Sequence, residues 1–197
     1  MDSLPVGITP PAGLRSSLAA RVRELARPRR RQALAAILVL AAVCDFYGLQ
    51  RNGYANLYYA AAIRSMLQSW HNFVFVSFDP GGFVSVDKPP LGFWIQAASA
   101  KLLGFSGFSI LLPLALAGVA SVGVLYLIVR RISGAPAGLF VALFLALTPV
   151  SVVTNRNNTI DSLLVLAVLL AAYAAASAGT HRRSRHEAAR CQSMTAL

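Results

Sequence analysis

The chain has 197 residues, of which 56% are hydrophobic and 13% are charged, and its formal net charge is +11. Soluble domains are roughly 45–50% apolar and 25% charged, and a soluble protein of this length has no core that could bury such long apolar runs, so we predict an all-α polytopic membrane protein. Most of the 18 Lys and Arg residues gather in two blocks that flank apolar segments, a pattern that sets membrane topology and gives no reason to expect a nucleic-acid partner.

The first segment is a basic arm over residues 1–31, rich in arginine and proline. We expect little fixed structure there and a position near anionic lipid headgroups on the cytoplasmic side. Residues 32–50 are almost all apolar, and 19 residues at 1.5 Å each span roughly 28 Å, enough to cross the membrane outward. Asp45, near the outer end of this span, is expected to snorkel or to bond a neighbouring helix.

An external loop over residues 51–105 follows, with charged and aromatic residues interleaved. Within it, apolar residues recur at spacings of three and four, which predicts an amphipathic helix in the membrane interface. These residues are Tyr59, Ala62, Ile63, Met66, Leu67 and Trp70. The apolar run 91–103 follows Pro89-Pro90 and is too short to span, so we predict a second interfacial helix.

Three further spans complete the predicted topology: 107–129 inward, 135–153 outward and 160–177 inward. This path keeps Arg130 and Arg131 in the cytoplasm, as the positive-inside rule prefers. It also returns the basic tail 178–197 to the side of the basic N-terminus. The sequence therefore predicts a multi-pass protein of the cell membrane with about four spans, a cytoplasmic N-terminus and its polar loops gathered outside.

The most distinctive string is Asp-Lys-Pro-Pro-Leu-Gly-Phe-Trp at 87–94. The paired prolines fix the backbone before a helix start, and a helix start favours anions, so Asp87 and Lys88 lie where a phosphate could bind. The alternative is that Asp87 merely caps the helix and Lys88 reaches lipid headgroups.

The order of three segments, Tyr58–Leu67, Asp87–Trp94 and Asn155–Asp161, resembles glycosyltransferase family 39 over roughly residues 35–177. That family includes protein O-mannosyltransferases and aminoarabinose transferases, integral-membrane enzymes of the GT-C fold. The resemblance implies the N-terminal part of that fold and transfer of a sugar from a polyprenyl-phosphate carrier. The acceptor would be an extracytoplasmic lipid, protein or glycan.

The resemblance also implies roles for single residues. Lys88 would lie by the carrier phosphate, whose negative charge grows as the glycosidic bond breaks. Arg64 or Arg156 would assist it, and Tyr59 is a further substrate-binding candidate. Asp161 matches an aspartate that lines the cavity and can touch a metal, so a divalent metal is a possible cofactor. Capping of the helix that begins near residue 160 is the alternative role for Asp161.

One departure from the family concerns the general base. Family members usually carry an Asp-Glu pair before the Tyr-Ala segment, whereas this chain has Ala55 and Asn56 there, and neither can take a proton. The remaining acids of the same loop are Asp87, which we take as the first candidate for the catalytic acid or base, and Asp79 as the second.

The chain is also shorter than members of that family, which suggests a truncated, fragmentary or frame-shifted product. Two other functions therefore stay open. One is a transporter or channel component, although such proteins usually place ionisable groups near the membrane midplane and often show repeated halves. The other is a non-catalytic membrane fragment.

Overall fold

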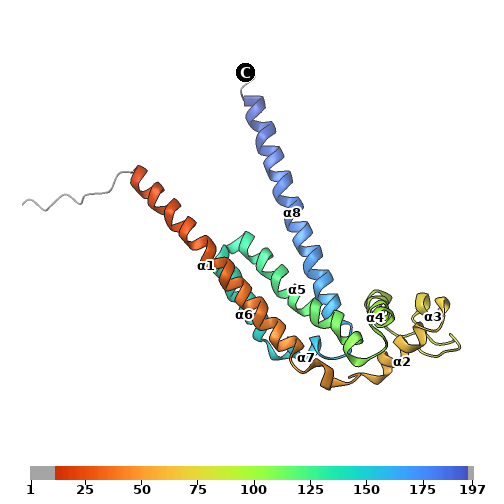
Figure 1. The fold of residues 1–197 in the computed structure, drawn as a ribbon. Helices are drawn as coiled ribbons and strands as arrows, with labels where there is room; N and C mark the ends of the chain where they lie inside the picture. The colour runs from red at the N-terminus through yellow and green to blue at the C-terminus, as the bar shows by residue number, and fades with distance from the viewer. Residues whose placement is uncertain (1–11, 195–197) are drawn as a thin grey trace, which may run out of the picture.

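The computed structural model describes residues 12–194, and the side chains of residues 28–178. The ends of the predicted arm and tail, residues 1–11 and 195–197, lie outside the described residues. The described elements, shown in Figure 1, are α1 (Ala12–Phe46), the 3-10 helix η1 (Leu49–Asn52), α2 (Leu57–Met66), α3 (Trp70–Phe75), α4 (Pro90–Leu103), α5 (Gly107–Ser133), α6 (Ala135–Leu147), α7 (Pro149–Asn155) and α8 (Asp161–Met194).

The predicted all-α class is confirmed over residues 12–194. The only β feature in this range is an isolated antiparallel bridge between Ser77 and Ser85 in the loop before α4. The arm differs from its prediction, because α1 begins at Ala12 and runs through most of it. Alanine, leucine and arginine, which fill this segment, are among the best helix formers, although Pro28 lies inside the helix.

Three described segments are long and apolar enough to cross a membrane, namely Pro28–Asn52, Gly107–Ser133 and Asp161–Ala178. A fourth candidate is the pair formed by α6 and α7, which is bent by 62°. The bend follows from Pro149, the first residue of α7, because a proline disfavours helical backbone in the residue before it. That residue, Thr148, is extended (φ −68°, ψ 115°).

Helix α5 lies at the centre of the bundle and packs against α1, α4, α6 and α8 (Figure 1). A small apolar core joins α1, α5 and α6, built from Ile37, Ala41, Val122, Tyr126, Ala142 and Ala146. Small residues let these helices approach closely: a Cβ on Gly138 would lie 3.0 Å from the Tyr126 ring. Close backbone packing of this kind is typical of membrane helices.

Helices α2, α3 and α4, with the loops between them, form a separate unit, here called the α2–α4 unit, at one end of the bundle beside the start of α8 (Figure 1). Its core includes Ile63, Phe93, Ile110 and Ile160. The predicted amphipathic helix of the loop is in fact two helices, because the Ser69 side chain caps α3 after α2 has ended. Trp70 consequently leaves the apolar face and is 77% exposed.

Helix α4 has 14 residues. At 1.5 Å per residue it is about 21 Å long, too short to cross the hydrocarbon layer. It packs against α5 through a buried face that contains Phe93, Gln96 and Ala97. This helix carries Asp87 and Lys88 just ahead of its first turn.

Candidate functional site

The start of α4 lies against the start of α8. A Cβ built on Gly92 would lie 2.8 Å from Cγ2 and 2.9 Å from Cβ of Ile160, so only glycine fits this contact without a shift. Gly92 belongs to the first turn of α4, and Ile160 directly precedes α8. The segment that carries Asp87 and Lys88 therefore lies beside the helix start that carries Asp161.

A buried network of amide side chains holds this arrangement. Gln96 on α4 donates from Nε2 to Oδ1 of Asn158 (2.8 Å) and to the carbonyl of Ile110 (3.2 Å). Asn158 in turn donates from Nδ2 to the carbonyl of Asn56, at the start of α2 (3.1 Å). Gln96 and Asn158 are fully buried, so the network fixes α4 and the turn before α8 relative to each other.

Sequence reasoning missed Gln96 and placed no weight on Asn158. The sequence does contain an indication of this network. Gln96 lies four residues after Gly92 on the apolar face of α4, and an amide buried there needs a hydrogen-bond partner.

Asp87 and Lys88 are both exposed and form no hydrogen bond or ion pair with the described residues. The helix cap position is Pro89, and no side chain caps α4. The structure therefore does not show the capping role that was the alternative for Asp87. Both side chains are available to a substrate at the start of the helix.

The Asp79 carboxylate is hydrogen-bonded to the backbone of its own loop. Its carboxylate accepts hydrogen bonds from the backbone N–H groups of Val84 (2.7 Å) and Phe83 (3.2 Å). These bonds stabilise the ionised form and hold the pKa of Asp79 below its ordinary value. A carboxylate of lowered pKa is a weaker base, so these bonds make Asp79 less suited to accept a proton.

The positions where the family usually carries its acid pair have structural roles here. The Asn56 side chain caps α2 by accepting from the N–H groups of Tyr58 (3.0 Å) and Tyr59 (3.4 Å). Ala55 has a φ of 53°, in the left-handed region.

Asp161 is exposed, lies in the first turn of α8 and accepts no hydrogen bond from the described residues. It lines a cavity of about 340 Å³ between α5, the α6–α7 bend and α8. Among the residues that the structure describes, no three His, Cys, Asp or Glu side chains are grouped as a metal site would require. The described side chains thus do not by themselves fit the divalent metal that the resemblance implied, and no step of the mechanism is derived through one.

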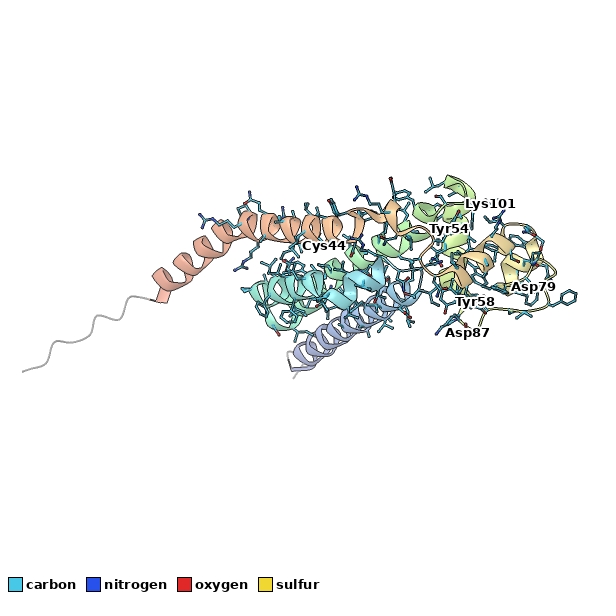
Figure 2. The ribbon with its side chains drawn as sticks, turned by 90° about the horizontal axis from the view of Figure 1, so that it is seen from below. Cys44, Tyr54, Tyr58, Asp79, Asp87 and Lys101 are labelled. Carbon is cyan, nitrogen blue, oxygen red and sulfur yellow. The ribbon has the colours of Figure 1, made fainter. Side chains whose placement is uncertain are left out.

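The two arginines expected to assist Lys88 lie elsewhere. Arg64 is placed over the ring of Phe105, 5.7 Å from its centroid. Phe105 follows the C-terminal end of α4, whereas Lys88 precedes its N-terminal end, so the length of the helix, about 21 Å, separates the two regions. In Figure 2, Lys101 in the last turn of α4 and Asp87 before its first turn lie on opposite sides of the α2–α4 unit. The structure does not bring Arg64 and Lys88 together.

Arg156 is held near the C-terminal end of α1. Its Nη1 donates to the carbonyl of Cys44 (2.9 Å), and its own carbonyl accepts from Asn52 Nδ2 (3.0 Å). Tyr59, the remaining substrate-binding candidate, is half-buried and packs its ring edge against Phe93, with centroids 5.3 Å apart.

The intramembrane acid Asp45 is buried and bonded to a neighbouring helix, one of the two roles expected for it. Asn155 on α7 donates from Nδ2 to its carboxylate oxygens (3.1 and 3.3 Å). Gly118 on α5 leaves the room for this pair, because a Cβ there would lie 2.1 Å from the Asn155 nitrogen and 2.6 Å from an Asp45 oxygen.

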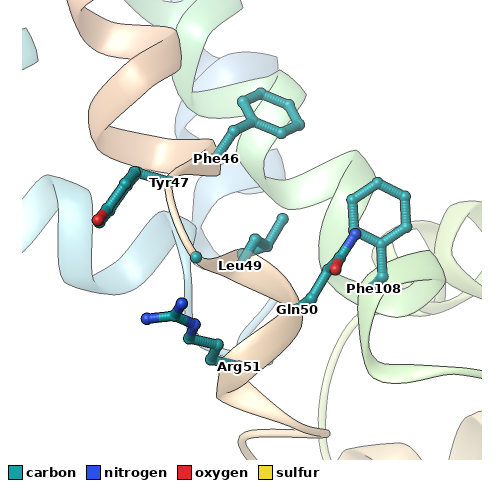
Figure 3. A pocket seen from close by; sticks show the side chains of 7 residues that line it. Phe46, Tyr47, Leu49, Gln50, Arg51 and Phe108 are labelled. Carbon is teal, nitrogen blue, oxygen red and sulfur yellow. The ribbon is translucent and has the colours of Figure 1, made fainter.

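A second cavity, of about 310 Å³, lies beside the turn that follows α1 (Figure 3). Phe46, Tyr47, Leu49, Gln50, Arg51 and Phe108 line it together with Gly48. Its lining contains none of the predicted site residues and no acidic side chain.

Comparison with known proteins gives one family match. The model of the family described as dolichyl-phosphate-mannose-protein mannosyltransferase matches residues 87–187, just over half of the chain, starting at Asp87. Two proteins of Bacillus subtilis (strain 168) are similar: "Putative mannosyltransferase YycA" is 49% identical over 138 residues, and "Putative mannosyltransferase YkcB" is 43% identical over 137 residues.

Each alignment covers 70% of this chain, but only 20% and 19% of the respective relative. The chain therefore spans about a fifth of the length of the curated relatives that it matches. No solved structure matches it.

Proposed function

Because this chain belongs to the dolichyl-phosphate-mannose-protein mannosyltransferase family, we propose that it forms the donor-binding part of a membrane glycosyltransferase. The enzyme moves a sugar from a polyprenyl-phosphate carrier to an acceptor hydroxyl on the outer side of the cell membrane. The relatives bear the name mannosyltransferase, so the proposed sugar is mannose. The N-terminus is cytoplasmic in this proposal, which keeps Arg130 and Arg131 inside.

The observation that carries the proposal is the contact between the starts of α4 and α8 at Gly92 and Ile160. This contact lies between an unpartnered pair, Asp87 and Lys88, and the exposed carboxylate of Asp161. We call Asp87, Lys88 and Asp161 the donor site.

Lys88 binds the carrier phosphate in this mechanism. Its ammonium group and the positive end of the α4 dipole both favour an anion at the helix start. As the bond between the anomeric carbon and the phosphate oxygen breaks, the leaving phosphate gains negative charge, and a fixed cation stabilises that charge more in the transition state than in the ground state.

Asp87 acts as the base. It accepts the proton of the acceptor hydroxyl while the acceptor oxygen attacks the anomeric carbon from the side opposite the phosphate. The new C–O bond forms as the old one breaks, with inversion at the anomeric carbon, and the polyprenyl phosphate leaves. Asp79 is the second candidate, weakened by its two backbone hydrogen bonds.

Photo-crosslinking tests this proposal. The chain in lipid nanodiscs is irradiated with a benzophenone-bearing polyprenyl phosphate, and the labelled peptides are identified by mass spectrometry. We expect label on the segment around residues 87–92 and on the start of α8, with loss of label when unlabelled mannosyl polyprenyl phosphate is added. Uniform labelling along the lipid-facing helices, unaffected by the competitor, would refute the donor-binding role.

A further inference from the structure

Two arginines flank the turn that joins α1 to η1. Gly48 forms this turn with a φ of 66°, and a Cβ built on it would lie 3.8 Å from Cδ of Arg51 and 4.0 Å from Nη2 of Arg156. Apart from the chain neighbours of Gly48, no other atom of the described residues comes within 4 Å of that point. The two arginine side chains therefore border one open space over the turn.

The positive charge at this turn is not neutralised by an ion pair among the described residues. Arg51 is exposed, and its side chain forms no hydrogen bond or ion pair with them. Arg156 donates from Nη1 to the carbonyl of Cys44, which is uncharged. Asp45 lies close enough to attract Arg156, but it is buried and its carboxylate accepts from Asn155. The open space over the turn is thus positively charged and suits an anion.

The cavity of about 310 Å³ beside the turn adds hydrogen-bond donors to this charge. Tyr47 and Gln50 line it together with Arg51, and Figure 3 shows the Tyr47 hydroxyl and the Arg51 guanidinium on the same side of the turn. A phenol hydroxyl, an amide and a guanidinium all donate hydrogen bonds to phosphate oxygens. A volume near 310 Å³ lies at the lower end of the range for small-molecule sites, which suits a single headgroup.

An exposed apolar stripe on α1 leads to this cavity. Val39 and Val43 on α1, and Tyr47 directly after it, are 63%, 54% and 74% exposed. Residues four apart lie on the same face of a helix, and the helical register continues to Tyr47, whose N–H donates to the carbonyl of Val43 (2.9 Å). A ligand that combines a phosphate with an apolar chain would occupy both the turn and the stripe.

Both arginines lie at the end of an apolar segment. Arg51 is in the last turn of the candidate span Pro28–Asn52, and Arg156 directly follows α7, the second helix of the bent pair. Basic residues at the ends of membrane segments reach the level of the lipid headgroups, where they attract anionic lipids. The anion expected at this turn is therefore a lipid phosphate.

We propose that Arg51 and Arg156 bind the phosphate of an anionic glycerophospholipid, with an acyl chain along Val39 and Val43. The bound lipid joins the end of α1 to the end of α7. The site shares no residue with the donor site, and the inference does not depend on the proposed function. A polyprenyl phosphate has the same chemistry, a phosphate on an apolar chain. The donors of Tyr47 and Gln50 favour a phospholipid, because its headgroup carries acceptors beyond the phosphate.

Native mass spectrometry of the chain in detergent micelles tests this site, because it counts the lipids that stay bound at each lipid concentration. The probes are phosphatidylglycerol and phosphatidylcholine with the same acyl chains, and a polyprenyl phosphate. Arg51→Ala is the test variant, since the Arg51 side chain has no bond to a described residue whose loss would unfold the chain. Lys101→Ala is the matched control, because Lys101 is exposed, carries the same charge and also lies at the end of a helix.

We expect the wild type to bind phosphatidylglycerol about tenfold more tightly than phosphatidylcholine, whose choline cation the arginines repel. Arg51→Ala should weaken phosphatidylglycerol binding by roughly tenfold, the effect of losing one hydrogen bond to a charged group. Arg51→Lys, which keeps the charge, should retain part of the preference, and Lys101→Ala should bind as the wild type does.

Three results would overturn the site: a wild type without preference between the two phospholipids, a preference that survives in Arg51→Ala, or an equal loss in Lys101→Ala. If Arg51→Ala weakened polyprenyl phosphate binding as strongly as phosphatidylglycerol binding, the turn would bind the carrier and the phospholipid assignment would be wrong.

Discussion

Gln96 on α4 donates a 2.8 Å hydrogen bond to Asn158 in the turn before α8, joining two fully buried side chains that are 62 positions apart. This single bond links the helix that carries Lys88 to the helix that carries Asp161. Each side chain also donates to a backbone carbonyl: Gln96 to that of Ile110, and Asn158 to that of Asn56. The donor site thus depends on an amide network rather than on apolar packing alone.

The contributions of Gln96 and Asn158 to stability should be coupled, because the two side chains share a hydrogen bond. Gln96→Leu leaves the Asn158 oxygen without its donor, at a cost of about 1–3 kcal/mol, and Asn158→Leu should cost a similar amount. The double variant should lose less than the sum, because the hydrogen bond between Gln96 and Asn158 can be lost only once. Thermal unfolding in detergent followed by circular dichroism measures this, and strictly additive losses would show that the two side chains are independent.

Gly92→Ala should separate α4 from α8. The added Cβ would meet Ile160 at 2.8 Å, and a β-branched side chain has few rotamers with which to retreat. Overpacking of this kind costs about 1–3 kcal/mol, and binding of polyprenyl phosphate should weaken because Lys88 is displaced.

The combination of Gly92→Ala with Ile160→Ala should restore the binding, at least in part. Gly123→Ala is the matched control, because its Cβ would meet only a Leu38 methyl at 3.8 Å. If the Gly92 variant binds and unfolds like the Gly123 variant, the close helix contact is not needed.

Asn155→Ala should destabilise the bundle by more than Asp45→Asn does. The first change strips the Asp45 carboxylate of its Asn155 donor and costs roughly 2–4 kcal/mol, because hydrogen bonds to buried charged groups are the expensive ones to lose. The second removes the buried charge while keeping the side-chain shape. Urea or guanidinium unfolding in detergent ranks the two, and the reverse order would mean that the Asp45–Asn155 bond does not hold α7 on α1.

The loop around Asp79 should lose stability in acid. The pKa of Asp79 is lowered in the folded chain by the Val84 and Phe83 amides, so the unfolded loop takes up a proton first as the pH falls. The stabilisation is fully present above the ordinary value of 3.8 and is lost as the pH drops from there through the folded pKa. Hydrogen exchange at the Phe83 and Val84 amides should accelerate over that window beyond its intrinsic pH dependence.

Asp79→Asn is the comparison for this pH effect. In this variant, hydrogen exchange at the Phe83 and Val84 amides should not accelerate in acid beyond its intrinsic pH dependence. Donor binding near neutral pH should be unchanged, because Asp87 and not Asp79 is the proposed base. If Asp79→Asn abolished sugar transfer and Asp87→Asn retained it, Asp79 and not Asp87 would be the base.

The sequence predicted the features that depend on local pattern. Long apolar runs predicted the apolar helices, and Pro89-Pro90 predicted a helix start directly after Lys88, where α4 begins at Pro90. The break in the third predicted span was not foreseen, although Pro149 marks it.

The features that depend on long-range packing were not predictable from pattern. Arg64 and Arg156 were expected beside Lys88, yet Arg64 contacts Phe105 and Arg156 donates to the Cys44 carbonyl. Gln96 lies in the predicted apolar run 91–103, and pattern could not pair it with Asn158, which is 62 positions away.

Binding of the carrier phosphate by Lys88 is tested most directly by the affinity of the chain in nanodiscs for a polyprenyl phosphate. Lys101 is the matched control, because it is also exposed and belongs to the last turn of the same helix. Loss of one hydrogen bond to a charged group is worth about 1.5–3 kcal/mol, so Lys88→Ala should weaken binding by roughly tenfold or more while Lys101→Ala stays close to the wild type. Equal affinities for the two variants would contradict the assignment of Lys88.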